Sequence, residues 1–454
     1  MDFEQMKKRQ IIRVAITEII MTLAVIFLTF AFVMVVSGYW INSDLEVKQN
    51  GFIQISSIPR GATIKIDDDT WFNRTNASQM VSSGEQTVTL SREGYDTWTK
   101  KINVSEGVLY QLSYPRLFKL ERKKSELLDI KNKKVSFSSD GDMMLLMDGS
   151  AIFDFVDLAN EKLESKKINM SGVLLSGVQV VDNIMWSENN NRVLLHTINQ
   201  EWILSSTKKP DYLNLTKEFG LNFSAIKPLD ESYDEIIVIE NGNLRSVNTN
   251  AKSISKILDV NVKKVWTYDG EIFYVTSDKN GNDNIYYLIN EEKIKIYEDV
   301  KSPQLAFMRF YDEKYLAILN DANLKIYKGD LPRRMTDELN QELVFEAAVE
   351  GDELISGLSG NFVMVKNGTR ISSLNMEEMK MNYYELESND FGWLDDYLIY
   401  AIQQDGKMIV RDFDGENRRE VVVTGANASY PAIIARDKYL YYFTDSQLIR
   451  EEIY

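Results

Sequence analysis

The side chains that most often perform catalysis are scarce in this sequence of 454 residues. The chain has no cysteine and one histidine, His196. Without cysteine there are no disulfides, thiolate nucleophiles, or zinc and iron–sulfur sites with cysteine ligands. A histidine-dependent triad or metal site would have to be built around His196, which lies in an alternating apolar segment and is expected on a strand. We therefore predict no catalytic residue, no bound metal and no cofactor.

Carboxylates are abundant, and two acidic segments have a composition that invites a calcium proposal. Asp67–Asp69 are consecutive, so they cannot all point to one ion, and a solvated turn is expected. The segment Asp278–Asn284 has glycine at its fourth position rather than the sixth and lacks the distal glutamate of a calcium loop, so it is predicted to be a hairpin.

The formal net charge of the chain is −16. Nucleic acid is therefore not an expected partner, because phosphate binding requires a basic surface. An extracytoplasmic protein without cysteine is common in bacteria and unusual for a eukaryotic ectodomain.

The strongest single feature is an uncharged apolar run of 23 residues from Ile19 to Ile41. Such a run is long enough for a helix to cross the hydrocarbon core of a bilayer, which is roughly 30 Å thick. We predict a cytoplasmic tail over residues 1–18 and a transmembrane helix over 19–41, with Tyr39 and Trp40 at its outer edge. A cleaved signal peptide is the main alternative, although its apolar region is normally shorter, and a buried core helix is another.

The charges that flank this run predict its orientation. Lys7, Lys8, Arg9 and Arg13 precede it, and Asp44 and Glu46 follow it. Basic residues remain on the cytoplasmic side, so the N-terminus is expected inside the cell and the later domains outside. The lipid bilayer is thus the first predicted partner, and the cell membrane the predicted location.

A small all-β domain is predicted over residues 51–120, after a linker at 42–50. Ile53 and Ile55, and then Ala62, Ile64 and Ile66, alternate with polar residues, which indicates two strands. The strands are joined through Pro59-Arg60-Gly61, where proline presets a turn and glycine tolerates a positive φ.

This segment resembles the PEGA domain in its turn at Pro59, Gly61 and Ala62 and in a later Gly94-Tyr95 step. Arg60 stands where that family has glutamate, and the family's middle turn is altered in this sequence. The resemblance implies a small β-sandwich of the prokaryotic cell surface or envelope. It also implies adhesion or spacing rather than catalysis, so the five motif residues are expected to be structural.

The rest of the chain, residues 121–454, repeats one pattern: an aromatic or apolar residue, a polar turn, and an alternating strand. The first residues of the eight units are Phe137, Trp186, Ile226, Trp266, Phe310, Leu358, Trp393 and Ile434. Their mean spacing of about 42 residues is the length of a four-stranded propeller blade. The pattern predicts an all-β fold with a propeller of seven or eight blades, with eight favoured.

The last unit provides only about three strands, so an earlier segment, near Leu117–Leu120 or Leu127–Ile130, is expected to add the fourth strand. The stretches Phe137–Met147 and Met408–Val423 also resemble the two halves of a TolB-type propeller blade. This resemblance implies the fold and leaves the activity open, because propellers host both binding and catalysis. The longest interruption of the repeats, Asp330–Leu343, is a candidate contact surface.

These expectations combine into a single-pass protein of the bacterial cell envelope that is not an enzyme. It is predicted to display a propeller outside the membrane for binding to an envelope protein or a cell-wall polymer. The alternative is a propeller-type glycoside hydrolase or lyase that acts on surface glycans through two carboxylates about 5–10 Å apart. A sensor that signals through its short cytoplasmic tail ranks last.

Overall fold

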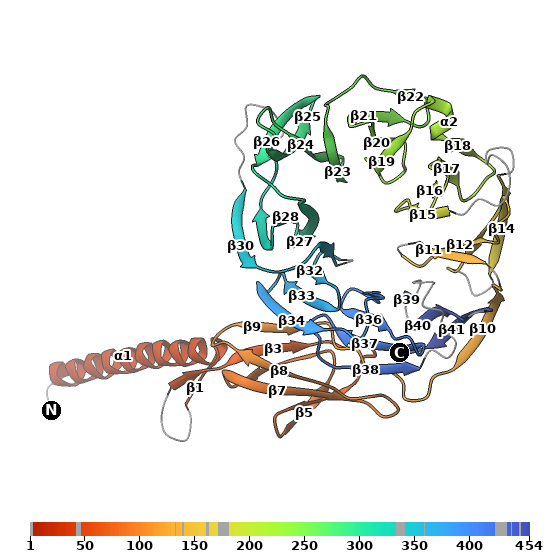
Figure 1. Ribbon diagram of the computed structural model, residues 1–454. Coiled ribbons are helices and arrows are strands. Elements are labelled where there is room, and N and C mark those ends of the chain that lie inside the picture. Colours follow the sequence, from red (N-terminus) through yellow and green to blue (C-terminus); the bar gives the residue numbers. More distant parts are fainter. Residues whose placement is uncertain are drawn as a thin grey trace. The chain divides into compact units, whose positions relative to one another are not determined.

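The computed structural model consists of two units (Figure 1). Unit 1 comprises Met1–Arg122 together with Ile453–Tyr454, and unit 2 comprises Lys123–Glu452. The residues described are 3–41, 47–131, 133–138, 140–159, 163–170, 181–332, 341–357, 359–422, 434–436, 438–444 and 446–454.

Unit 1 begins with the long helix α1 (Phe3–Val36). The helix ends earlier than the predicted Ile41, because Gly38 takes a positive φ of 81° and the next residues are extended. Strand β1 (Tyr39–Ile41) pairs with β2 (Val47–Gln49) in an antiparallel ladder. The predicted helix over 19–41 is thus wrong at its end, and the predicted linker is partly a strand. Residues 42–46 lie outside the described residues.

The remainder of unit 1 has two sheets, with strand orders β6–β3–β9 and β5–β4–β7–β8. Strand β3 pairs in parallel with β9, and its other neighbour is antiparallel. The two strands predicted around Pro59-Arg60-Gly61 are β3 and β4, and they belong to different sheets. The strands are β3 (Gly51–Ile55), β4 (Thr63–Ile66), β5 (Asp69–Arg74), β6 (Ala77–Val81), β7 (Gly84–Ser91), β8 (Trp98–Val104) and β9 (Leu109–Leu112).

The core of unit 1 follows from the alternation of its strands. Ile53 and Ile55 from β3 and Ile64 from β4 are fully buried, as the period of two predicts. Trp98 at the start of β8 is also fully buried, with its ring edge-on to Tyr114 at 5.9 Å. The predicted small β-sandwich is confirmed.

The last two residues of the sequence belong to this core and not to unit 2. The backbone N–H of Lys119 donates to the carbonyl of Ile453 at 2.9 Å, and Ile453 is fully buried. The ring of Tyr454 lies 5.3 Å from that of Phe118. Unit 1 is therefore built from two stretches of sequence that are separated by the whole of unit 2.

Unit 2 is a ring of four-stranded antiparallel sheets, and eight such sheets are found among its described residues (Figure 1). Seven are formed by consecutive strands, with the first strand innermost. The first four of these comprise β11 (Lys134–Phe137), β12 (Met143–Met147), β13 (Ile152–Asp157), β14 (Glu164–Asn169); β15 (Val181–Trp186), β16 (Arg192–Thr197), β17 (Trp202–Ser206), β18 (Tyr212–Asn214); β19 (Phe223–Pro228), β20 (Glu235–Glu240), β21 (Asn243–Asn248), β22 (Ser253–Ile254); and β23 (Val262–Tyr268), β24 (Glu271–Ser277), β25 (Asp283–Ile289), β26 (Glu292–Tyr297).

The other three consecutive sheets follow the same order. They comprise β27 (Gln304–Phe310), β28 (Glu313–Asn320), β29 (Asn323–Lys328), β30 (Glu342–Ala348); β31 (Glu353–Ser356), β32 (Phe362–Asn367), β33 (Arg370–Asn375), β34 (Lys380–Glu385); and β35 (Phe391–Trp393), β36 (Leu398–Ile402), β37 (Lys407–Asp412), β38 (Arg419–Val422). Seven of the eight predicted repeats begin in the first strand of a sheet, and Leu358 lies outside the described residues.

The eighth sheet closes the ring with strands from both ends of unit 2. It has the order β10–β41–β40–β39, in which β10 (Lys124–Asp129) pairs with β41 (Gln447–Glu452). The other two strands are β39 (Ile434–Arg436) and β40 (Tyr439–Phe443). Of the two segments predicted to supply the missing strand, the one near Leu127–Ile130 is therefore the correct one.

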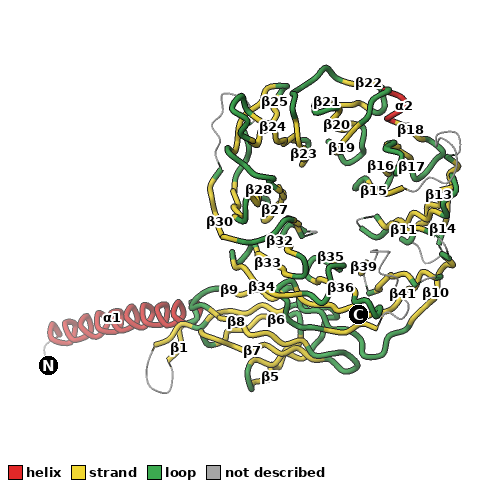
Figure 2. Tube along the Cα trace, in the orientation of Figure 1, coloured by secondary structure: helices red, strands yellow, loops and turns green. Residues whose placement is uncertain are grey.

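Apolar cores lie between neighbouring sheets. Phe155 from one sheet and Leu195 from the next share one such core. The core that closes the ring joins Phe443 and Leu448 of the last sheet to Met144 and Leu146 of β12. Packing of this kind buries the faces of neighbouring sheets against each other. The predicted propeller fold is confirmed, and Figure 2 traces the ring of strands.

One short helix in unit 2 was not predicted. Helix α2 (Leu215–Phe219) follows β18, with the side chain of Asn214 accepting a hydrogen bond from the backbone of Lys217 and with Gly220 in the left-handed conformation. An asparagine cap and a terminal glycine are a recognisable helix signature, so this element was accessible from the sequence.

Candidate functional site

Helix α1 presents its apolar side chains to the surroundings. The segment Ile12–Val36 is long and apolar enough to cross a membrane. Phe27, Leu28 and Phe32 are each more than 60% exposed, which would be costly in water. The helix is consistent with a single-pass anchor or with a signal peptide.

The threonine hydroxyls within this helix are satisfied internally. The hydroxyls of Thr17, Thr22 and Thr29 donate to backbone carbonyls four residues earlier, at 2.8 to 2.9 Å. A polar group in hydrocarbon has no water to bind, so bonding within the helix is what a bilayer requires.

The predicted Pro59-Arg60-Gly61-Ala62 turn is held against a single threonine. Gly61, with φ of +83°, donates its N–H to the carbonyl of Thr75 at 2.7 Å, and the N–H of Ala62 donates to the Thr75 hydroxyl at 2.9 Å. Ala62 is fully buried. The hydroxyl of Ser57 donates to the carbonyl of Pro59 at 2.7 Å. In these contacts the motif has a structural role, because they hold the turn in place.

The second half of the predicted motif lies near the first. Gly94 has φ of +80°, and its carbonyl accepts the N–H of Leu120 at 3.0 Å. Arg92 connects the two halves, because its guanidinium donates to the carbonyl of Arg60 at 2.6 Å and lies 5.2 Å from the centre of the Tyr95 ring. Sequence reasoning missed Arg92 and Thr75, and only their place in the fold identifies them.

The single histidine has the contacts of a structural strand residue. His196 lies on β16 as predicted, with Nδ1 2.6 Å from the Oδ1 atom of Asp182. Its ring packs against Trp202, with 4.4 Å between the ring centres. The carboxylate and the indole together orient the imidazole.

The two acidic segments form turns, as predicted. Asp67 and Asp68 join β4 to β5 in a tight hairpin. Asp278 begins the hairpin between β24 and β25, and its carboxylate accepts the backbone N–H groups of Asn280 and Asn282. The described residues contain no group of three or more acidic or histidine side chains that could hold a metal ion.

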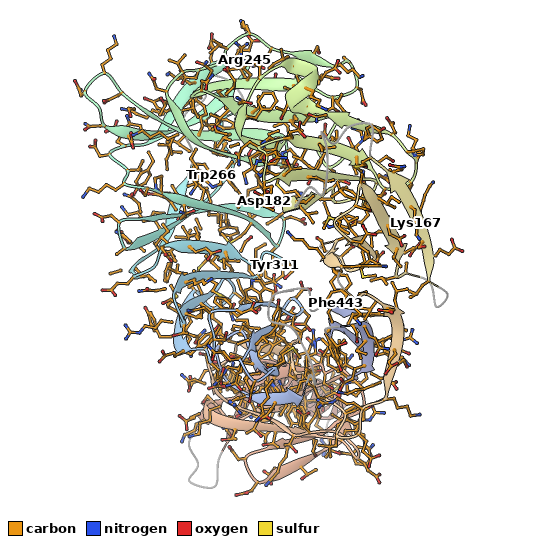
Figure 3. All side chains as sticks on the ribbon, turned by 45° about the vertical axis from the view of Figure 1, so that its right-hand side comes forward. Lys167, Asp182, Arg245, Trp266, Tyr311 and Phe443 are labelled. Atoms are coloured by element: carbon orange, nitrogen blue, oxygen red, sulfur yellow. The ribbon has the colours of Figure 1, made fainter. Side chains whose placement is uncertain are left out.

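A cavity of about 520 Å³ lies at the centre of the ring, at the end where the innermost strands turn back. Its lining includes Tyr268, Phe307 and Arg309, and also Glu188 from the β15–β16 turn. The sheet of Glu188 is not a neighbour of the sheet that contains β27, so the cavity spans the middle of the ring. Tyr311 and Asp182 also lie towards the middle, whereas Lys167 points outward from β14 (Figure 3).

The carboxylates with perturbed acidity do not converge on this cavity. Burial raises the pKa of Glu271, although Lys314 opposes the shift. Burial likewise raises the pKa of Glu377 and Asp390. These three groups belong to three different sheets, and Glu188 is the carboxylate that lines the cavity among the described residues. The predicted contact surface at Asp330–Leu343 falls largely outside the described residues.

Comparison with known proteins gives one family match and several fold matches. The comparison with curated proteins found no match. Among solved structures, the chain is similar to the β-propeller domain of Cps50 (Swd1) from Myceliophteria thermophila, with 11% identity, a TM-score of 0.42, and coverage of 63% of this chain and 97% of that one.

Two further solved structures are similar. The C-terminal WD40 domain of Sif2 gives 11% identity, a TM-score of 0.48, and coverage of 73% of this chain and 98% of that one. An oligogalacturonate lyase from Vibrio parahaemolyticus gives 9% identity, a TM-score of 0.40, and coverage of 89% and 98%. Residues 50–117 match the PEGA domain. The chain thus combines a PEGA-like segment with an apolar N-terminal helix and a β-propeller unit.

Proposed function

We propose that this protein is a single-pass membrane protein of the bacterial envelope that binds an envelope protein or a cell-wall polymer outside the cell. The observation that carries the proposal is the exposed apolar surface of α1 over Ile12–Val36, joined to two β-rich units. The helix supplies the anchor, and the loops of a rigid propeller supply recognition surfaces.

The flanking charges support an orientation with the β-rich units outside. Lys7, Lys8, Arg9 and Arg13 precede the apolar segment or lie at its start, and Asp44 and Glu46 follow it. The basic side is retained in the cytoplasm. The 25-residue apolar segment also exceeds the apolar region of a signal peptide, which is about 7–15 residues, and this difference favours a retained helix.

Binding is favoured over catalysis because of the lining of the central cavity. A glycosidase of the usual kind needs two carboxylates that flank the scissile bond. Among the described lining residues the cavity has Glu188, together with the aromatic side chains Tyr268 and Phe307 and the cation Arg309. Aromatic and cationic side chains of this kind are suited to binding a ligand.

Protease treatment of sealed cells tests the topology. Protease added outside should cut both units and leave a short membrane-bound fragment that contains α1. A protein of full mass in the membrane fraction excludes removal of a signal peptide. If the β-rich units are protected in sealed cells and cut only after lysis, the proposed orientation is wrong.

Crosslinking on intact cells tests the binding role. The expected products are covalent complexes with an envelope protein or with wall polymer, and they should be lost when unit 2 is deleted. Release of reducing ends or unsaturated sugars from wall polymer by the purified protein would instead establish an enzyme.

A further inference from the structure

Positive charge is concentrated on the innermost strands of the ring. These eight strands carry six basic and two acidic residues, an excess of four positive charges in a chain whose formal charge is −16. The eight outermost strands carry seven basic and eight acidic residues. The basic residues of the innermost strands are Lys134, Lys227, Lys263, Lys264, Arg309 and Arg436.

Two of these lysines donate to neutral oxygens rather than to carboxylates. Their partners lie in the innermost strand of the neighbouring sheet or directly before it. Lys134 Nζ donates to the carbonyl of Val181 at the start of β15. Lys264 Nζ donates to Oε1 of Gln304 at 2.7 Å and to the carbonyl of Pro303 at 3.3 Å. Both ammonium groups therefore reach from one sheet to another along the inner wall, with their charge not neutralised by these partners.

The charges of Lys227 and Lys264 also act on each other. Burial, followed by the positive charge of Lys227, lowers the pKa of Lys264. Both side chains are half-buried, and among the described residues neither forms an ion pair. Like charges in a partly desolvated wall are unfavourable, so an anion placed between them would be bound favourably.

Lys263, the neighbour of Lys264, has its charge neutralised by a carboxylate. Lys263 lies on the same strand as Lys264, but its Nζ donates to both carboxylate oxygens of Asp283, at 2.6 and 2.8 Å. Two adjacent residues of one strand thus differ in whether their charge is neutralised, which makes Lys263 a matched control.

The central cavity touches the innermost strands at β23, β27 and β31. Arg309 lines it, and Tyr268 and Phe307 stack there with 5.1 Å between ring centres. Because the chain as a whole is acidic, a broad polyanion such as a nucleic acid duplex would be repelled by the rest of the surface. A slender chain that lies along the innermost strands would meet their excess of positive charge.

We propose that the inner wall of the propeller binds a single polymer chain that carries phosphate or carboxylate groups, with Lys134, Lys227 and Lys264 as its cationic contacts. This inference rests on the proposed function and narrows its ligand to an anionic cell-wall polymer. The two anion chemistries share the same contacts, so the experiment includes one probe of each.

Binding is measured with the full chain in non-ionic detergent micelles. The probes are linear polyphosphate, alginate as the carboxylate polymer, and neutral dextran, each followed by fluorescence anisotropy over a series of salt concentrations. At least one of the two anionic polymers should bind, with an affinity that falls as salt is added, and dextran should not bind. The slope of log affinity against log salt should decrease by about 0.7 for each lysine removed, if the ammonium groups release counterions as they do on single-stranded nucleic acid.

The decisive comparison is between variants of equal charge. The triple variant K134Q/K227Q/K264Q should reduce that slope by about 2. The control K256Q/K263Q/K407Q removes three lysines that are paired with Glu291, Asp283 and Glu420 and should keep most of the wild-type slope. Of the single variants, K264Q should reduce the salt slope more than K263Q does.

Equal losses in the two triple variants would overturn the proposal, because the effect would then be general electrostatics. Equal binding of dextran would show that charge is not recognised. If inorganic phosphate displaced polyphosphate at the same concentration of phosphate groups, the inference that a polymer chain is recognised would be wrong. None of these results changes protease accessibility or crosslinking on cells, so failure here is distinct from failure of the proposed function.

Discussion

The left-handed backbone at Gly61 is the residue-level feature on which the PEGA-like turn depends. Its φ is +83°, and a Cβ atom added there would meet nothing within 4 Å. Gly61→Ala should therefore destabilise unit 1 by roughly 1–2 kcal/mol through backbone strain alone, without a steric clash. Hydrogen exchange of the β4 amides in the full chain measures this loss.

Gly61→Asn is the matched variant, because asparagine tolerates a positive φ better than alanine. It should cost less than Gly61→Ala, although its side chain is larger. If the asparagine variant proves the less stable of the two, the cost comes from the size of the side chain and not from φ.

Glu387 in unit 2 gives a prediction about acid stability. Burial alone would raise its pKa, but hydrogen bonds from Arg411 at 2.6 Å and Arg418 at 2.9 Å outweigh burial and hold the pKa below the ordinary 4.5. An acid with a lowered pKa stabilises the fold above its ordinary pKa, and this stabilisation is lost as the pH falls through the folded value.

Glu387→Gln should therefore destabilise unit 2 by about 2 kcal/mol at neutral pH. The difference from the wild type should shrink as the pH falls below 4.5. Urea unfolding across a pH series measures it, with Glu353→Gln at the more exposed Lys366 pair as the control. A difference that stays constant with pH would show that packing, and not charge, is lost.

At the scale of single residues, the sequence predicted those whose structural role depends on neighbours in the sequence. Gly61 and Gly94 follow from turn chemistry, and His196 follows from strand alternation. Thr75 and Arg92 could not be predicted, because their hydrogen bonds join backbone positions many residues apart. The unneutralised charge of Lys264 likewise depends on Gln304, 40 residues away, while its neighbour Lys263 finds a carboxylate.

At the scale of elements, closure of the ring depends on the sheet that joins β10 to β41. Ile130, just after β10, is 2% exposed and shares a core with the fully buried Leu448 of β41. Ile130→Ala and Leu448→Ala should each destabilise unit 2 by about 3 kcal/mol. In both variants hydrogen exchange should increase in β10, β40 and β41 together.

Ile198→Ala serves as the control, because that side chain is 53% exposed, and it should cost less than about 0.5 kcal/mol. If Ile130→Ala affects only β10 and leaves β41 protected, the closing sheet is not a cooperative unit.

The strands of both units were predictable because alternation and polar turns are local signals. The pairing of these strands was less predictable. The parallel pair β3 and β9 joins segments more than 50 residues apart, and no turn residue encodes that contact. The helix end at Val36 was missed because Ser37-Gly38-Tyr39-Trp40 is uncharged and apolar enough to extend the run, although Gly38 was the signal for termination.

At the scale of the whole molecule, Ile453 and Tyr454 belong to the unit that also contains the N-terminal residues. Tyr454 is 7% exposed, with its ring against Phe118. Tyr454→Ala should destabilise unit 1 by about 3 kcal/mol and leave unit 2 unchanged. Limited proteolysis of the full chain distinguishes the units, since new cleavage is expected within residues 51–122. New cleavage confined to unit 2 would contradict this assignment.

The propeller is thus an insertion between Arg122 and Ile453 of the smaller unit. A chain synthesised from its N-terminal end delivers most of the smaller unit first, yet Ile453 and Tyr454 follow only after the whole propeller. The ring of Tyr454, which packs against Phe118, and the carbonyl of Ile453, which accepts the N–H of Lys119, are thus supplied only after the propeller. Completion of the core of the smaller unit therefore depends on synthesis of the whole ring, and a ribosome that stalls within the propeller leaves that core without Ile453 and Tyr454.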